Sequence, residues 1–406
     1  MNLLHNQTKA LTKQLPNKVG ALFMKMGTGK TRVAVELVNA VADLDLVVWV
    51  GPLRSIEPLD KTLPSIKDEI AKWGGFNAKE VIYVGVESIG QSDRTYLKLF
   101  NKIRHTLDNT FLVVDESIKI KNHTAKRTQR LLEMSKWCEF KLILNGEPIT
   151  KDLLDLWPQL NFLDPRILNM SLPEFQNTFC KYTTVTKRFR GYKTYEKSFI
   201  TGYENIDYLY SLIGEYVFEC DLELSISKIF EDQNYSLSSE EMETYQYFKE
   251  KYLDDEKLQM MNNNIFLEMT QKMQHGYCCS ESKFEKVSSW IVDESKTIIF
   301  TKYIASAEEC RKRFPKAKVL NYKTGSMSLN LQEYPYTVYF DQTFDWGDVI
   351  QSQHRNYRTG AEQDVKYLRL IGNVGLEKLI LENNKKKLGI SEYLKKISRK
   401  ELKEKL

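Results

Sequence analysis

The sequence lacks the cysteine patterns of disulfide-rich and zinc-binding domains. Its six cysteines include no C-x-x-C pair, so they supply neither a disulfide framework nor the ligand spacing of a zinc site. We interpret them as buried thiols of a reducing compartment. The adjacent Cys278 and Cys279 lie near His275, but three such residues fall short of a four-ligand set, and core packing is the favoured interpretation.

Long hydrophobic runs are also missing. The longest apolar stretches, such as residues 46–50, are far too short to cross a bilayer. The N-terminus lacks the basic-then-apolar pattern of a signal peptide. The sequence therefore predicts a soluble, cytoplasmic protein with no membrane partner.

No large excess of one charge is present. The chain has 59 Lys and Arg residues against 54 Asp and Glu, a formal net charge of +5, so a nucleic-acid partner must be argued from local patches. No internal repeat or low-complexity tract occurs. With 406 residues and 42% hydrophobic content, the chain is long enough for two or three domains.

Short apolar runs alternate with helical patterns in two blocks, which is typical of parallel α/β units. We therefore predict an α/β fold with two lobes, each a parallel sheet flanked by helices. The candidate strands are residues 19–23, 46–50, 81–84, 111–114 and 141–144 in the first block, and 297–300, 337–341 and 365–371 in the second.

Four segments are expected along the chain. The region between the two blocks is rich in Tyr, Phe, Glu and Lys and has helical periodicity, which predicts a helical connector with protrusions. The C-terminal stretch has the composition of an exposed basic helix. The predicted boundaries are 1–165 for the first lobe, 166–285 for the connector, 286–375 for the second lobe and 376–406 for the basic helix.

A phosphate-binding loop is predicted at residues 26–31, MGTGKT, which follow an apolar strand and open a helix. Glycines let backbone N–H groups cradle phosphates, Lys30 reaches the β and γ phosphates, and the Thr31 hydroxyl ligates magnesium. Met24 replaces the first glycine of the strict pattern, so a glycine-rich turn is the alternative. The expected nucleotide-binding residues of the loop are Met26, Gly27, Thr28, Gly29, Lys30 and Thr31.

Two adjacent carboxylates, Asp115 and Glu116, follow another apolar strand. Asp115 suits the magnesium shell, and Glu116 suits polarisation of the attacking water. A D-E pair alone usually marks a solvated loop, but this one follows an apolar strand downstream of a phosphate loop. Together the two motifs predict a site for ATP and Mg²⁺. Gln7 is expected to hold the adenine, because its amide both donates and accepts hydrogen bonds.

The order of these motifs resembles the Swi/Snf family of helicase-like ATPases, within superfamily two, from about residue 4 to residue 371. Residues 115–122, DESIKIKN, are similar to the second motif of that family, in which a lysine-asparagine pair follows the acidic box. Lys121 and Asn122 match this pair and are candidate nucleic-acid contacts. The resemblance implies two RecA-like lobes, a minimal motor that uses ATP and Mg²⁺, and DNA as a partner.

Residues 144–149, LNGEPI, and 155–160, DLWPQL, resemble the third motif, which is normally LTGTPI followed by DLWxQL. Asn145 and Glu147 replace both threonines. The threonine hydroxyls are thought to link the ATP state to lobe movement in the family. The replacement of both threonines is therefore expected to affect how the ATP state is linked to lobe movement, rather than ATP binding.

Three motifs are expected in the second lobe. Residues 297–301 are similar to the fourth and residues 324–331 to the fifth, which places Gly325 at the ATP site and Ser326 at a DNA phosphate. Residues 351–360 resemble the sixth, Q-x-x-x-R-x-x-R-x-G, and add Gln351 to the nucleotide contacts.

Arg355 and Arg358 of the sixth motif are three residues apart, which predicts that both lie on one side of a helix. From there they are expected to reach the γ-phosphate across the lobe interface as arginine fingers. The alternative is a solvated basic helix face. The residues before this motif, 344–346, and residues 218–220 before the second lobe depart from the family pattern, so the docking of the lobes is expected to be unusual.

Residues 187–197 interleave cations with aromatic residues around a glycine. This pattern predicts a β-hairpin that presents charge to DNA, with Arg188 and Arg190 as candidate contacts, and an ordinary solvated hairpin is an equal alternative.

Together these features predict a monomeric, DNA-dependent ATPase that translocates on double-stranded DNA by closing and opening two lobes, in phage or bacterial replication, recombination or repair. The alternatives are an ATP-binding scaffold, a motor subunit of a larger DNA-processing or defence complex, and a strand-separating helicase. Lys121, Asn122 and the DLW block argue against an RNA-directed helicase.

Overall fold

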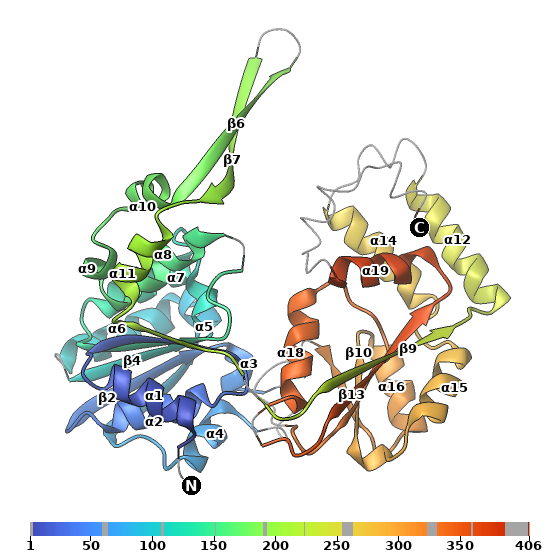
Figure 1. The fold of residues 1–406 in the computed structure, drawn as a ribbon, viewed down its shortest axis with the longest axis horizontal. Helices are drawn as coiled ribbons and strands as arrows, with labels where there is room; N and C mark the ends of the chain where they lie inside the picture. Colours follow the sequence, from blue (N-terminus) through green and yellow to red (C-terminus); the bar gives the residue numbers. More distant parts are fainter. Residues whose placement is uncertain are drawn as a thin grey trace. The chain divides into compact units, whose positions relative to one another are not determined.

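The protein forms two compact units, Met1–Leu222 and Glu223–Leu406, each with its own sheet (Figure 1). The structure, a computed structural model, describes residues 3–58, 64–106, 109–150, 152–189, 193–222, 224–253, 263–322, 331–358, 360–385 and 405.

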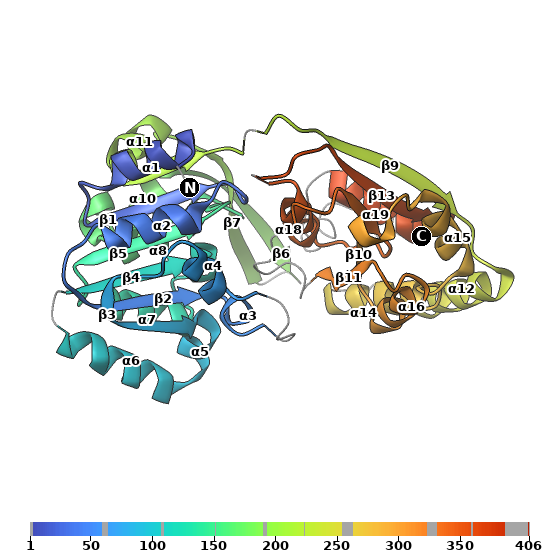
Figure 2. The same ribbon diagram turned by 90° about the horizontal axis from the view of Figure 1, so that it is seen from below.

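The first unit contains a six-stranded parallel sheet (Figure 2). Most of its strands are continuous apolar runs because both faces of the sheet are covered. The strand order is β3 (Ala78–Gly85), β2 (Leu44–Gly51), β4 (Thr110–Asp115), β5 (Phe140–Asn145), β1 (Val19–Met24) and β8 (Val217–Cys220).

Helices pack on both faces of this sheet. Alternate residues of a strand point to opposite faces, so Leu22 of β1 belongs to one buried cluster and Ala21 and Phe23 belong to the other. The first cluster includes α1 (His5–Gln14), α2 (Lys30–Asn39) and α4 (Ile66–Lys72). The second includes α5 (Val86–Gln91), α6 (Asp93–His105), α7 (Lys126–Ser135), α8 (Leu156–Leu163), α9 (Pro165–Leu168), α10 (Leu172–Phe179) and α11 (Ile206–Ile213).

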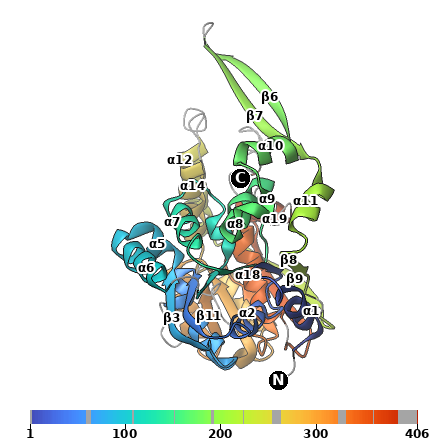
Figure 3. The same ribbon diagram turned by 90° about the vertical axis from the view of Figure 1, so that its left-hand side faces the viewer.

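The remaining elements of the first unit lie in its loops, apart from one long hairpin. Strands β6 (Cys180–Phe189) and β7 (Lys193–Tyr203) form a separate antiparallel pair that extends away from α10 and α11 (Figures 1 and 3). The short elements are α3 (Leu53–Ile56), η1 (Ser117–Ile120) and η2 (Leu153–Asp155).

The second unit contains a five-stranded parallel sheet in the order β11 (Lys318–Asn321), β10 (Thr297–Thr301), β12 (Tyr336–Tyr339), β13 (Val365–Gly372) and β9 (Lys228–Tyr235). Its helices are α12 (Ser239–Leu253), α14 (Asn263–His275), α15 (Glu281–Trp290), α16 (Ile304–Arg313), α18 (Trp346–Asn356) and α19 (Gly375–Lys385), with the short η3 (Glu294–Lys296). None of the helices in the described part of the chain has the length and apolar character that a bilayer span requires.

These sheets confirm the predicted α/β fold class, and all eight predicted strands are present. The division of the chain differs from the one predicted, because it falls between Leu222 and Glu223 rather than near 165 and 285. The expected connector is shared between the units: β8 extends the first sheet and β9 the second. Both are edge strands, so they lack the long apolar runs by which the central strands were found.

The structure of the C-terminal segment also differs from the prediction. A basic helix was expected from residue 376, but α19 belongs to the core of the second unit, where Leu376, Leu379 and Ile380 are buried. Residues 386–404 and 406, which hold most of the basic stretch, lie outside the described residues.

A buried ion pair lies inside the second unit, beside β12. The Lys283 Nζ is 2.7 Å from Asp341 Oδ1, and both side chains are only 2% exposed. Asp341 Oδ2 accepts hydrogen bonds from the Lys302 amide at 2.9 Å and from the Ser306 hydroxyl at 2.5 Å. The pair therefore joins α15 and α16 to the carboxyl ends of the central strands.

We expect Lys283→Met to lower the free energy of unfolding by about 3–5 kcal/mol, because it leaves the Asp341 carboxylate buried without its cation. Urea denaturation measures the change. Lys286→Met on the same helix is the matched control and should be nearly neutral. A loss of the same size in both variants would contradict a specific role for the pair.

Candidate nucleotide-binding site

The predicted phosphate loop connects β1 to the N-terminus of the ten-residue helix α2. Gly27 and Gly29 have φ values of 87° and 85°, in the left-handed region that favours glycine. A Cβ atom on Gly29 would also lie 2.2 Å from Nε2 of Gln7. Both glycines are therefore required by the backbone, which turns the loop into the start of α2.

Gln7 packs directly against this loop. Its side chain is 4% exposed, its Nε2 donates to the Thr28 carbonyl at 3.1 Å, and its Oε1 accepts from the Leu4 amide at 3.0 Å. The Thr28 hydroxyl in turn donates to the Lys25 carbonyl at 2.7 Å. Gln7 thus supports the loop, while the adenine contact expected for it stays a prediction.

The acidic pair lies at the end of β4, as predicted. Asp115 is the last residue of the strand, and Glu116 follows with φ of 53° and donates its amide to Asp115 Oδ1 at 3.0 Å. Burial, together with the Glu116 charge, raises the pKa of Asp115 to about 7, and the Lys30 ammonium opposes this rise. Lys30 and Asp115 therefore act on each other electrostatically, so the structure brings the two predicted motifs into one site.

These residues fit a nucleoside triphosphate with Mg²⁺. The glycine backbone and the N-terminus of α2 suit phosphates, and Lys30 supplies a cation beside them. Ionisation of the buried Asp115 carboxyl group is unfavourable unless a cation is nearby, which suits a metal ligand. Thr31, the other expected ligand, lies in the first turn of α2. The described residues contain no cluster of three His, Cys, Asp or Glu, and Mg²⁺ commonly takes only one or two carboxylates plus phosphate oxygens.

The third motif follows β5, the strand between β4 and β1. Asn145 is 2% exposed; its Oδ1 accepts from the Glu147 amide at 3.1 Å, and its Nδ2 is 3.5 Å from the Ser117 hydroxyl. Ser117 donates to Gln159 Oε1 at 2.6 Å. Gln159 Nε2 donates to the Pro148 carbonyl at 2.8 Å. Asn145 thus joins a buried polar network that connects the acidic box to α8.

Glu147, the second departure in this motif, contacts the phosphate loop. Its Oε1 lies 3.3 Å from the Lys25 Nζ. The neighbouring Gly146 is equally close to the loop, because a Cβ atom there would be 3.3 Å from Cγ and 3.5 Å from N of Met26. A charged pair therefore connects the third motif to the phosphate loop. This pair could not be predicted from the family pattern, which has a threonine in place of Glu147.

Lys121 and Asn122, the candidate nucleic-acid contacts, make contacts within the first unit. Lys121 Nζ hydrogen-bonds the Thr150 hydroxyl and lies 3.6 Å from Asp155 Oδ2. Asn122 Oδ1 accepts from the Thr124 amide at 3.0 Å and hydroxyl at 2.8 Å. Their role toward nucleic acid stays a prediction.

The sixth motif differs from its prediction in one respect. Gln351 and the buried Arg355 lie on α18, but this helix ends at Asn356, so Arg358 lies in the bend that follows and not on the same helical face. Asn356 Nδ2 donates to the Tyr334 carbonyl at 3.0 Å and to Thr337 Oγ1 at 2.8 Å. These tertiary contacts end the helix, and a spacing rule cannot detect them.

Four other predicted residues have no side-chain description. Gly325, Ser326 and Arg190 lie outside the described residues, and for Arg188 only the backbone, in β6, is described.

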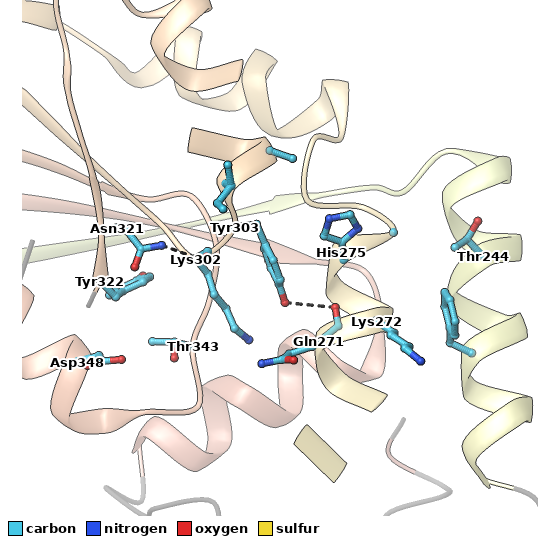
Figure 4. Close-up of a pocket in the computed structure, with 14 residues that line it drawn as sticks. Thr244, Gln271, Lys272, His275, Lys302, Tyr303, Asn321, Tyr322, Thr343 and Asp348 are labelled. Carbon is cyan, nitrogen blue, oxygen red and sulfur yellow. Dashed lines mark hydrogen bonds between the residues drawn. The ribbon is translucent and has the colours of Figure 1, made fainter. Parts of the chain in front are cut away.

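The second unit also has a cavity of about 760 Å³ (Figure 4). Lys302 and Tyr303 follow β10 and line it, with Asn321 from the end of β11 and His275 from α14. Lys302 Nζ donates to Gln274 Oε1 at 2.6 Å, and the Tyr303 hydroxyl donates to the same oxygen at 3.1 Å. These residues were not among the predicted site residues, although Lys302 directly follows the predicted fourth motif.

The fold and the site together define a phosphate-loop nucleotide-binding protein of parallel α/β architecture. The SNF2-related domain family matches residues 76–286, just over half of the chain. The chain belongs to this family, which confirms the resemblance to Swi/Snf proteins seen in the motifs.

Individual relatives are distant. The chain is 24% identical to "ATP-dependent helicase brm" of Drosophila melanogaster over 93% of its own length and 28% of that protein. It is 22% identical to "Transcription regulatory protein SNF2" of Saccharomyces cerevisiae over 91% and 26%. The chain thus spans about a quarter of the length of these eukaryotic relatives, and the phage or bacterial origin expected for it stays a prediction.

Among solved structures, the chain has a weak likeness to the SWI2/SNF2 ATPase core of Sulfolobus solfataricus in complex with dsDNA. The TM-score is 0.43 at 17% identity, over 94% of this chain and 90% of that chain.

The raised pKa of Asp115 gives a pH-dependent prediction. The folded state keeps Asp115 protonated up to about pH 7, whereas the unfolded state loses this proton near the ordinary pKa of 3.8. The free-energy penalty of ionising Asp115 in the folded state therefore grows between pH 3.8 and about 7 and is constant at higher pH. Asp115→Asn should therefore stabilise the metal-free protein at pH 8 and have little effect at pH 4, as measured by urea denaturation. Asp45, whose pKa the Lys79 side chain lowers, is the control, and Asp45→Asn should not stabilise at pH 8. A gain for Asp115→Asn that is the same at both pH values would contradict this account.

The Lys25–Glu147 pair gives a second prediction. Lys25→Met should weaken binding of a fluorescent ATP analogue about two- to fivefold, because it leaves the Glu147 carboxylate uncompensated beside the phosphate loop. Adding Glu147→Gln should restore the affinity. Lys18→Met, which breaks the exposed pair with Glu139, is the control. An equal loss with and without Glu147 would show that the two charges are not coupled.

Proposed function

We propose that the chain is a DNA-dependent ATP hydrolase of the helicase-like kind, which translocates on double-stranded DNA. The observation that carries the proposal is the shared site in the first unit, where Lys30 from the phosphate loop and the Asp115–Glu116 pair meet at one edge of the sheet. Membership of the SNF2-related domain family supports it.

The residues of the first unit have distinct roles in this proposal. The N–H groups of residues 27–31 and the Lys30 ammonium bind the β and γ phosphates. Thr31 and Asp115 hold Mg²⁺, which supplies charge neutralisation at the phosphate oxygens when bound. Glu116 orients a water molecule for attack and accepts its proton. The left-handed backbone at Glu116 turns the chain out of the direction of the strand directly after Asp115.

The second unit supplies Arg355 and Arg358, which we propose neutralise the charge that develops on the γ-phosphate when the two lobes close. Their positions support a division of roles, since Arg355 is 4% exposed on α18 and Arg358 lies in the bend beyond it. Arg358, the more exposed of the two, is the better candidate for the finger. Gln351, on the same helix, is proposed to contact the nucleotide.

DNA is proposed as the partner on the strength of family membership and the motif order, and the working unit is proposed to be a monomer. A second candidate function, an ATP-binding scaffold or a subunit of a larger complex, is favoured by one observation. The third motif, which would couple ATP state to movement, has Asn145 tied into a buried network and Glu147 paired with Lys25. Such a protein would bind ATP without DNA-stimulated turnover.

Steady-state ATP hydrolysis with duplex DNA, single-stranded DNA, RNA or no nucleic acid tests the proposal. We expect duplex DNA to stimulate turnover most, and both Lys30→Ala and Arg358→Ala to reduce it at least a hundredfold, because each removes a cation from the phosphate site. Lys9→Ala, an exposed lysine on α1, is the matched control.

The other outcomes are equally informative. ATP binding without stimulation by any nucleic acid would contradict the translocase and favour the scaffold. Stimulation by RNA alone would contradict DNA as the partner.

A further inference from the structure

Trp49 of β2 has a buried indole N–H that donates to no acceptor in the described part of the chain. The side chain is 0% exposed, and its Nε1 is without a hydrogen-bond partner. Two other indoles of the first unit are paired, since Trp73 donates to Glu69 and Trp157 to the Met170 carbonyl. A buried donor without a partner costs free energy, and nearly all such donors bond to protein groups or to ordered water. The Trp49 N–H therefore calls for an acceptor.

This indole nitrogen lies at the sheet edge where β4 delivers the acidic pair. Alternate residues of a strand share a face, and Trp49 belongs to the buried cluster on the α2 side of the sheet, so position 51 lies on that side as well. Val113 of β4 is in the same cluster, which places Asp115 there too. A Cβ atom on Gly51 would be 3.5 Å from Trp49 Nε1 and 3.8 Å from Asp115 Cβ. The indole and the expected metal ligand thus border one space beside Gly51.

A third polar group borders this space. The same Cβ atom on Gly51 would be 3.3 Å from Oγ of Ser55, which is 3% exposed. The Ser55 hydroxyl donates to the Pro52 carbonyl at 2.7 Å, so its oxygen is left as an acceptor. Asp115 takes the Glu116 amide on Oδ1 and has further acceptor capacity on its carboxylate. One donor and two acceptors therefore surround the space, and a single water satisfies this set by accepting one hydrogen bond and donating two.

We propose that a water molecule beside Gly51 joins the Trp49 indole N–H to the Asp115 carboxylate, which makes Trp49 a positioning residue for the metal ligand. Carboxylates that bind metals are themselves held by hydrogen bonds, and these outer partners fix the orientation of the ligand. The Glu116 amide holds Asp115 from its own strand end, and the bridged indole adds a support from β2. The inference rests on the proposed function in assigning Mg²⁺ to Asp115, and the support lies outside the predicted motifs.

The glycine at position 51 fits this arrangement. Its φ lies outside the left-handed region, so the backbone itself does not require glycine there. An alanine methyl would be 3.3–3.8 Å from the three polar neighbours, which a small adjustment accommodates, but it would take the place of the water. Gly51→Ala therefore fills the space while it leaves the indole unchanged.

Binding of Mn²⁺ to the full chain in the presence of ADP, followed by the electron paramagnetic resonance signal of the free ion, tests the proposal. Trp49→Phe should raise the Kd for Mn²⁺ about tenfold, because loss of an outer partner of a metal ligand typically has an effect of this order. Gly51→Ala should raise this Kd by a similar factor. Binding of ADP in EDTA should change less than about twofold in both variants, because the phosphate loop that holds ADP keeps its contacts.

Trp73→Phe is the matched control. Trp73 packs against the same buried cluster as Trp49, but its N–H donates to Glu69 Oε1 at 3.3 Å. This variant should leave the Kd for Mn²⁺ unchanged. Thermal unfolding of every variant reports whether the fold is intact, and Gly51→Ala carries the test if the smaller ring at position 49 destabilises the unit.

Equal losses of Mn²⁺ binding and of metal-free ADP binding in Trp49→Phe would show that Trp49 only packs the core, and would overturn the proposal. Unchanged Mn²⁺ affinity in both Trp49→Phe and Gly51→Ala would overturn it as well. These assays contain neither DNA nor ATP turnover. A wild type without DNA-stimulated ATP hydrolysis would therefore contradict the proposed function while leaving the metal-binding result standing.

Discussion

The candidate site depends on one constraint of the parallel sheet, which is that all its strands end at the same edge. β4, β5 and β1 are neighbours in the first unit, and each delivers a different motif at its carboxyl end. The acidic pair, the third motif and the phosphate loop therefore come together although Asp115 follows Lys30 by 85 positions in sequence. The left-handed conformations at Gly27, Gly29 and Glu116 complete the arrangement by turning the chain at these strand ends.

The same constraint explains how the altered third motif is accommodated. Because β5 lies between the other two strands, whatever follows it must contact both neighbouring loops. Asn145 contacts the acidic-box side through Ser117, and Glu147 contacts the phosphate-loop side through Lys25. Asn145 and Glu147 both depart from the family pattern, but each has a specific partner in this chain. If ATP turnover and movement are coupled here, the coupling uses an amide and an ion pair in place of two hydroxyls.

Much of the first unit could be predicted from sequence because its signals are local. An apolar run followed by MGTGKT or by Asp115 and Glu116 identifies a strand and its loop together. Contacts between distant segments could not be predicted in this way. Three examples depend on tertiary neighbours: Gln7 packs against Gly29, Lys121 pairs with Asp155, and α18 ends at Asn356. The edge strands β8 and β9 were missed because β8 has only four residues and β9, although eight residues long, is largely polar and lacks the apolar run of a central strand.

The central claim is that the phosphate loop and the acidic pair form one site for ATP and a metal ion. A crystal structure of the protein with a non-hydrolysable ATP analogue and Mn²⁺, whose anomalous signal locates the metal, tests this directly. The account predicts triphosphate density along residues 27–31 and a metal peak between the Thr31 hydroxyl and the Asp115 carboxylate. A nucleotide bound elsewhere, or a metal peak remote from Asp115, would contradict it.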